Sequence, residues 1–118
     1  QVERREDKEI HRYSLIQFEV RSSEITANNK PIVELIRKDI QPTSKVVITG
    51  NSDGLGNSTL NKQISERRAL ATVSALQLRY NDSNVVSEGK VITDLLDRPE
   101  RRFYARNVDV VIETPIKE

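Results

Sequence analysis

The chain has 118 residues, the usual size of one compact domain, and its 19 basic and 18 acidic side chains leave a formal charge of +1. This balance argues against a nucleic-acid-binding protein, which normally gathers a basic excess on one face. Cysteine is absent and only five residues are aromatic, which excludes disulfides and thiolate chemistry and disfavours base- or sugar-stacking platforms. Ile, Val, Leu and Phe together make 34 residues, enough for a modest core.

The first dozen residues are rich in both charge signs and poor in apolar side chains. We therefore expect residues 1–12 to be a charged linker or lead-in and residues 13–118 to form one domain. The only histidine, His11, falls in this lead-in and is expected to be a solvated surface imidazole. Methionine is absent, and no signal peptide or apolar run of membrane-spanning length is present, so we expect an excised domain or mature product anchored, if at all, through other segments.

Apolar periodicity alternates between strand and helix along the first half of the chain. Residues 13–20 alternate as a half-buried strand does. Thr26 can cap a helix over residues 27–40, whose apolar positions recur at helical spacing. Residues 45–49 form a short β-branched run, typical of a buried strand.

The second half continues the alternation. A loop rich in Gly, Asn and Ser is expected over residues 50–58, and the longest helix over 61–80. Residues 84–90 are a weaker strand candidate, 93–102 look irregular, and 105–114 alternate as a half-buried final strand. The order βαβαββ predicts an α/β fold of the α+β two-layer sandwich type: one mixed sheet with two helices packed on one face.

The glycine-rich loop fits none of three known binding loops. A phosphate-binding loop needs lysine where Asn57 stands, and a dinucleotide fingerprint meets Thr59 at its third glycine position. A calcium loop would place Lys62 where its bidentate glutamate belongs. By themselves, the glycines indicate a tight turn.

The longer string TGNSDGLGNSTLNKQISERRALATVSAL, residues 49–76, resembles the signature of the OmpA-like peptidoglycan-binding domain, as found in OmpA, MotB and Pal. The family pattern runs roughly G-H-T-D-x-x-G, then N-x-x-L-S-x-x-R-A and a helix. The resemblance extends over about residues 13–114. The matching positions are Gly50, Asp53, Gly56, Asn61, Ser65, Arg68 and Ala69.

This resemblance implies an OmpA C-terminal-like fold that binds peptidoglycan non-covalently through the diaminopimelate of its stem peptide. Diaminopimelate carries an ammonium and a carboxylate at one end, so Arg68 would hold the carboxylate and Asp53 the ammonium, with Asn61 serving either group. The resemblance also implies a periplasmic domain of a larger Gram-negative outer-membrane or envelope protein, without enzymatic activity, cofactor, metal or nucleic-acid partner.

The spacing of these residues supports one site. Asn61 and Arg68 are seven residues apart, which places them within about 20° of each other on a helix, whereas Arg67 points about 100° away from Arg68. Asp53 follows a strand, where open α/β sheets tend to bind ligands. An alternative is that an Asp53–Arg68 ion pair merely pins the loop.

Two departures from the family pattern bear on the ligand. Asn51 and Ser52 replace the common His and Thr, and Arg21 stands where many members carry Asp or Asn. Arg21 is included among the expected ligand residues, either adding a carboxylate contact or repelling the ammonium. The alternative function is a structural or assembly module of the same fold without peptidoglycan affinity. An enzyme is disfavoured because no nucleophile has a general base nearby in sequence.

Overall fold

The computed structural model describes residues 2–5, 7–15, 18, 22–53, 58–79, 82–92 and 107–116. Its elements, in chain order, are β1 (Val2–Arg4), β2 (Lys8–Leu15), the 3-10 turn η1 (Ala27–Asn29), α1 (Lys30–Asp39), β3 (Lys45–Asp53), α2 (Ser58–Ala75), β4 (Val85–Ile92) and β5 (Val108–Pro115).

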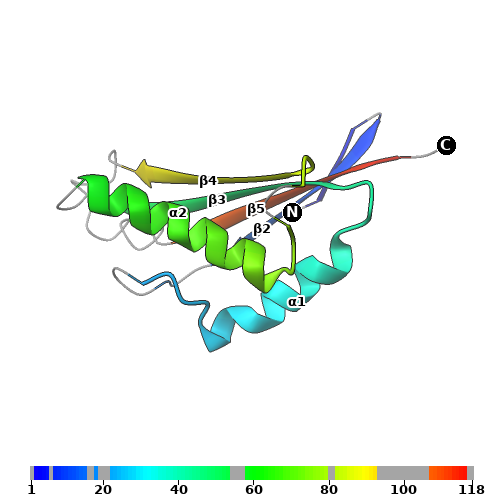
Figure 1. Ribbon diagram of the computed structural model, residues 1–118. Helices are drawn as coiled ribbons and strands as arrows, with labels where there is room; N and C mark the ends of the chain where they lie inside the picture. Colours follow the sequence, from blue (N-terminus) through cyan, green and yellow to red (C-terminus); the bar gives the residue numbers. More distant parts are fainter. Residues whose placement is uncertain are drawn as a thin grey trace.

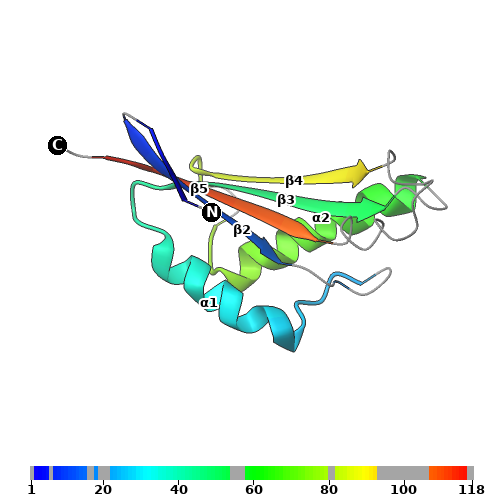
Figure 2. The same ribbon diagram turned by 180° about the vertical axis from the view of Figure 1, so that it is seen from behind.

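The strands form one five-stranded sheet in the order β1-β2-β5-β3-β4. Among the described strands, β3 and β4 pair in parallel and the other neighbours are antiparallel, so the sheet is mixed. Both helices lie on the same side of the sheet in two opposite views (Figures 1 and 2). The predicted two-layer α/β sandwich is confirmed, with β1 as an additional edge strand.

The expectation that residues 1–12 lie outside the fold as a lead-in is wrong for the part that the structure describes. β1 pairs with β2, and β2 begins at Lys8 instead of residue 13 and pairs with β5 along its whole length. Charged side chains are accommodated because strand pairing uses the backbone, and opposite charges meet across the hairpin: Arg12 Nη1 lies 2.9 Å from Glu3 Oε2. His11 is half-buried between two carboxylates, not solvated as expected.

The other element boundaries shift by a few residues. β2 ends at Leu15, although Phe18 beyond it is buried. β3 continues to Asp53, so the first part of the expected loop is strand. α2 begins earlier and ends at Ala75, where Gln77, with a positive φ of 58°, takes the chain out of the helix. The irregular segment expected at 93–102 lies outside the described residues.

The core lies between the sheet and the two helices. On β5 the alternate side chains Val108, Val110 and Ile112 are buried, which confirms the predicted face of this strand. α1 contributes Val33 and Ile36, in agreement with its predicted apolar side. The buried cluster comprises Leu15, Phe18, Val33, Ile36, Val46, Ile48, Ala69, Val73, Leu76, Val108, Val110 and Ile112.

Candidate functional site

Three strands deliver their carboxyl ends to the same edge of the sheet. β2 and β3 are both antiparallel to β5, and β4 is parallel to β3, so all three run in one direction. α2 begins at this edge, beside the tips of β3 and β4 (Figure 1, left). Open α/β sheets tend to bind ligands at such an edge.

Two glycines allow α2 to lie unusually close to the sheet. Gly50 of β3 and Gly89 of β4 are register partners. A Cβ on Gly50 would stand 1.9 Å from the carbonyl oxygen of Ser65, and a Cβ on Gly89 would stand 2.6 Å from the backbone nitrogen of Glu66. Both distances are far inside van der Waals contact. The absence of side chains at these positions therefore fixes where α2, and Arg68 upon it, lies against β3.

Arg68 is the largest fully buried side chain among the described residues, with 1% of its surface exposed. Its Nε donates to the carbonyl oxygen of Ser22 at 2.9 Å, and its Nη1 donates to that of Asn51 at 2.7 Å. The guanidinium carbon lies 5.5 Å from the ring centroid of Phe18, within the range of a cation–π contact. Arg68 thus connects α2 to β3 and to the segment that follows β2.

Asn61 lies on the same buried side of α2 as Arg68. Asn61 is 7% exposed, whereas Arg67 is exposed, as the helical spacing predicts. Ser52, the next-to-last residue of β3, donates its hydroxyl to the carbonyl oxygen of Asn61 at 2.8 Å. This bond joins the end of β3 to the first turns of α2.

Asn51 of β3 is held at this edge by hydrogen bonds with Asn107 and Asp109. Its side-chain amide donates to Asn107 Oδ1 at 2.9 Å and to Asp109 Oδ2 at 3.1 Å. Its backbone N–H donates to the carbonyl oxygen of Asn107 at 2.8 Å. Asn51 is therefore a well-anchored strand residue that presents its backbone oxygen to Arg68.

The structure places Asn61 and Arg68 on the same buried face of α2 but does not place the side chains of the other two predicted ligand residues. Asp53 is the last residue of β3, so its backbone lies at this edge, while its side chain is outside the description. Arg21 also lies outside the described residues. The convergence of Asp53 and Arg21 on Arg68 stays a prediction.

A family model identifies the chain. The model of the OmpA family matches residues 17–102, most of the sequence. The chain belongs to the OmpA family. No curated protein sequence matches it.

Solved structures share the fold of this OmpA-family chain. The cell wall anchor of the T6SS from Pseudomonas aeruginosa is 18% identical with a TM-score of 0.69, covering 97% of this chain and 87% of that one. The OmpA-like domain of FopA1 from Francisella tularensis is 21% identical with a TM-score of 0.71, and the match covers 99% of this chain and 80% of that one. The peptidoglycan-associated lipoprotein from Burkholderia pseudomallei is 21% identical with a TM-score of 0.66, and the match covers 84% of this chain and 88% of that one.

Sequence reasoning missed three contacts of this OmpA-family site. The carbonyl groups of Ser22 and Asn51 and the ring of Phe18 hold Arg68, and none of these was expected to do so. Backbone acceptors leave no signal in side-chain identity. The strand-like alternation over residues 13–20 is consistent with the burial of Phe18, but it does not predict the contact of this ring with Arg68.

Positive charge near this edge comes from Arg68 and from the amino end of α2, and negative charge comes from Asp109, which accepts a hydrogen bond from Asn51. Arginine stays protonated in proteins, and a charge removed from water attracts an opposite charge more strongly than an exposed one does. No acidic residue occupies the first turn of α2, whose amino end carries a partial positive charge. Among the described residues, no group of acidic or histidine side chains is arranged to hold a metal ion, and no helix is long and apolar enough to cross a membrane.

Proposed function

We propose that this OmpA-family domain binds peptidoglycan non-covalently and anchors a larger envelope protein to the cell wall. The observation that supports the proposal most directly is the buried cation of Arg68, held in one orientation by two backbone carbonyl groups on the helix face that also carries Asn61. A preoriented guanidinium binds a carboxylate with little loss of side-chain entropy. The names of two similar structures, a cell wall anchor and a peptidoglycan-associated lipoprotein, support the same role.

The ligand group we propose is the diaminopimelate of the stem peptide. Its free end carries a carboxylate and an ammonium on one carbon, and a site for it needs a cation and an anion a few ångströms apart. We assign the carboxylate to Arg68, the ammonium to Asp53 and a hydrogen bond with either group to Asn61. The proposed role is binding alone, without catalysis, cofactor or nucleic acid. The proposed location of the domain is the periplasm of a Gram-negative cell.

Co-sedimentation with purified peptidoglycan sacculi tests this function. The domain should pellet with sacculi, and an excess of free diaminopimelate-containing stem peptide should release it. Retention in the supernatant at every sacculus concentration would contradict the proposal.

One observation favours the second candidate, a structural or assembly module without peptidoglycan affinity. Arg68 is 1% exposed, and the hydrogen bonds described above go to the backbone of its own chain. On this account the guanidinium only joins α2 to the sheet. A folded domain that never binds sacculi would establish it.

Asp53→Asn should weaken sacculus binding ten- to a hundredfold. The substitution keeps the size of the side chain but removes the charge proposed to pair with the ammonium, and a charge-assisted bond contributes about 1.5–3 kcal/mol. Titration with stem peptide measures the change. Glu66→Gln is the matched control, because it makes the same charge change on the exposed face of α2. Equal losses from both substitutions would remove Asp53 from the site.

Arg21 should bias the site toward anionic ligands. Two arginines around one aspartate would make the groove cationic, so we expect free-carboxylate diaminopimelate to bind more tightly than the amidated form, with affinity that falls as salt is added. Arg21→Asp should reduce this preference. Titrations of both ligands at low and high salt measure it, and an unchanged preference ratio would show that Arg21 is a bystander.

A further inference from the structure

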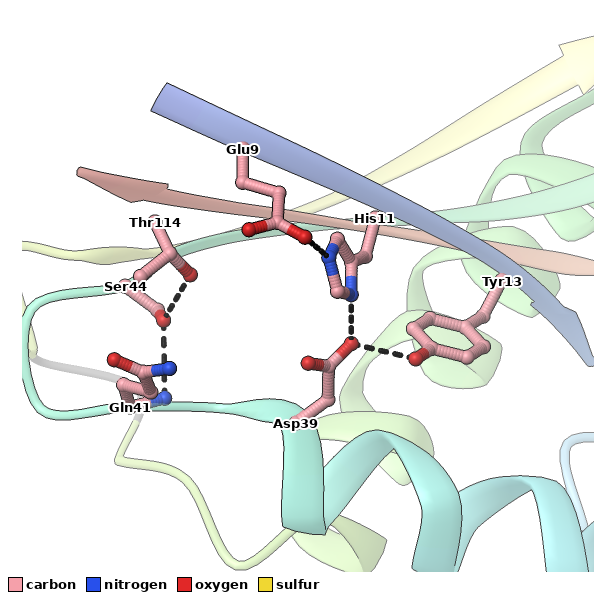
Figure 3. A network of polar contacts seen from close by, with 7 residues as sticks. All are labelled: Glu9, His11, Tyr13, Asp39, Gln41, Ser44 and Thr114. Carbon is pink, nitrogen blue, oxygen red and sulfur yellow. Dashed lines mark hydrogen bonds and ion pairs between the residues drawn. The ribbon is translucent and has the colours of Figure 1, made fainter. Parts of the chain in front are cut away.

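The only histidine of the chain lies at the joint between β2 and the carboxyl end of α1 (Figure 3). His11 pairs with Ile112, which pairs with Val46 near the start of β3, at the other end of this strand from Asp53. His11 Nδ1 lies 2.5 Å from Oδ2 of Asp39, the last residue of α1. His11 Nε2 lies 2.7 Å from Oε1 of Glu9, two residues earlier on β2. The ring is thus held between two carboxylates from two different elements.

Tyr13 completes the contact with α1. Its hydroxyl donates to the same Asp39 oxygen at 2.5 Å. His11 and Tyr13 are therefore two donors from one face of β2 that meet one carboxylate at the helix end (Figure 3). Burial, together with the hydrogen bond to Asp39, raises the pKa of Tyr13 to about 12, so this hydroxyl keeps its proton throughout the neutral range.

The other elements around His11 bring few charged groups near its ring. On β1, Arg4 is the register partner of Glu9 and is exposed. On β5, Thr114 faces Glu9 and is joined by a hydroxyl contact of 2.7 Å to Ser44. The last turn of α1 contains two basic residues, Arg37 and Lys38; the Nη atoms of Arg37 donate to Glu34 and Gln77.

The geometry of the ring fits only one protonation state. A carboxylate can only accept hydrogen bonds, so both ring nitrogens must donate if both short contacts are to be hydrogen bonds. A neutral imidazole has one donor nitrogen and one acceptor nitrogen, and would set a lone pair against one carboxylate. The imidazolium satisfies both contacts.

We propose that protonated His11 is a clamp that joins α1 to the sheet, and that loss of its proton loosens this joint. The charged ring also lies at the carboxyl end of α1, where the helix dipole favours a cation and opposes the nearby charge of Asp39. When the ring is neutral, either Glu9 or Asp39 loses its donor.

The hydrogen bond with Glu9 and the contacts with Asp39 raise the pKa of His11 above its ordinary value of 6.5, although partial burial opposes them. A raised pKa in the folded state means that the clamp contributes fully below pH 6.5, where the unfolded chain is also protonated. The contribution declines as the pH rises above 6.5 and disappears once the pH passes the pKa of the folded state. The domain should therefore be more resistant to unfolding at pH 5.5 than at pH 8.5.

A proton NMR titration tests the clamp directly, because a chain with one histidine gives one unambiguous ring signal. We expect the pH midpoint of the His11 titration to lie above 6.5 in the folded domain. In concentrated urea, where the chain is unfolded, the midpoint should have the ordinary value. Asp39→Asn, which keeps the size of the side chain, should lower the folded midpoint. A wild-type midpoint at or below 6.5 would overturn the proposal.

Urea unfolding at pH 5.5 and 8.5 supplies the second measurement. For the wild type, the urea concentration at half-unfolding should be lower at pH 8.5 than at pH 5.5. His11→Gln should remove most of this difference, because glutamine has a donor and an acceptor at every pH. Glu34→Gln is the control, since it changes a charge on the exposed face of α1 away from His11. A His11→Gln variant with the wild-type pH dependence would overturn the proposal. If that variant fails to fold, the NMR midpoints of the wild type and Asp39→Asn still decide it.

Discussion

Gly50→Ala should destabilise the domain by about 3 kcal/mol, the upper end of the usual cost of overpacking and a large share of the 5–15 kcal/mol typical of a domain. The added methyl group would stand 1.9 Å from the carbonyl oxygen of Ser65 and 2.8 Å from the backbone nitrogen of Ala69. Both atoms belong to the backbone of α2, so no side-chain rotation relieves the overlap. The helix must move away from β3, and the buried Val73 and Leu76 would lose contacts with the sheet.

Urea unfolding measures this loss. Thr49→Ala is a suitable control, because Thr49 precedes Gly50 on β3 and its side chain bonds only the exposed Glu88 at 3.1 Å among the described contacts. It should cost no more than about 1 kcal/mol. A Gly50→Ala domain as stable as this control would show that α2 does not need the close approach.

Arg68→Lys should reduce both stability and ligand binding. Lysine keeps the charge but lacks the planar fork that donates to Ser22 and Asn51 together. Leaving one buried carbonyl without its donor costs about 1–3 kcal/mol, and losing the oriented carboxylate contact proposed for Arg68 should weaken sacculus binding ten- to a hundredfold. Arg68→Ala is a poorer test, because it leaves both carbonyl groups unpaired and opens a cavity beside Phe18.

Urea unfolding and sacculus co-sedimentation, done on the same preparations, separate the two effects. Arg67→Lys is the matched control, since Arg67 is exposed on the same helix. Its stability and binding should match the wild type. An Arg68→Lys domain that is destabilised yet binds sacculi normally would assign Arg68 to the fold alone.

The features predictable from the sequence are those that depend on side-chain periodicity. Alternation identified the buried face of β5, and helical spacing placed Asn61 and Arg68 together while directing Arg67 to solvent. The mixed sheet with both helices on one face followed as well, because it is the simplest arrangement of these elements; the spatial order of the strands was not predicted.

The features that escaped prediction depend on the backbone and on distant partners. Residues 8–12 look like a solvated segment by composition, yet they pair with β5 through backbone groups that any sequence supplies. The contact of His11 with Asp39 escaped prediction, because Asp39 is far along the chain and reaches His11 only through the packing of α1. The sequence presents Arg68 as a partner for a carboxylate, of the ligand or of Asp53, whereas its bonds to carbonyl oxygens leave no trace in side-chain identity.

The central claim is that this edge of the sheet binds the end of diaminopimelate that carries the carboxylate and the ammonium. Calorimetric titration of the wild-type domain with three stem peptides tests it most directly: one with free diaminopimelate, one with its terminal carboxylate converted to a carboxamide, and one with its side-chain amine acetylated. The account predicts saturable binding of the first peptide and at least about tenfold weaker binding of each modified peptide, because each loses one charge-assisted contact. Equal binding of all three peptides, or no binding of any, would contradict it.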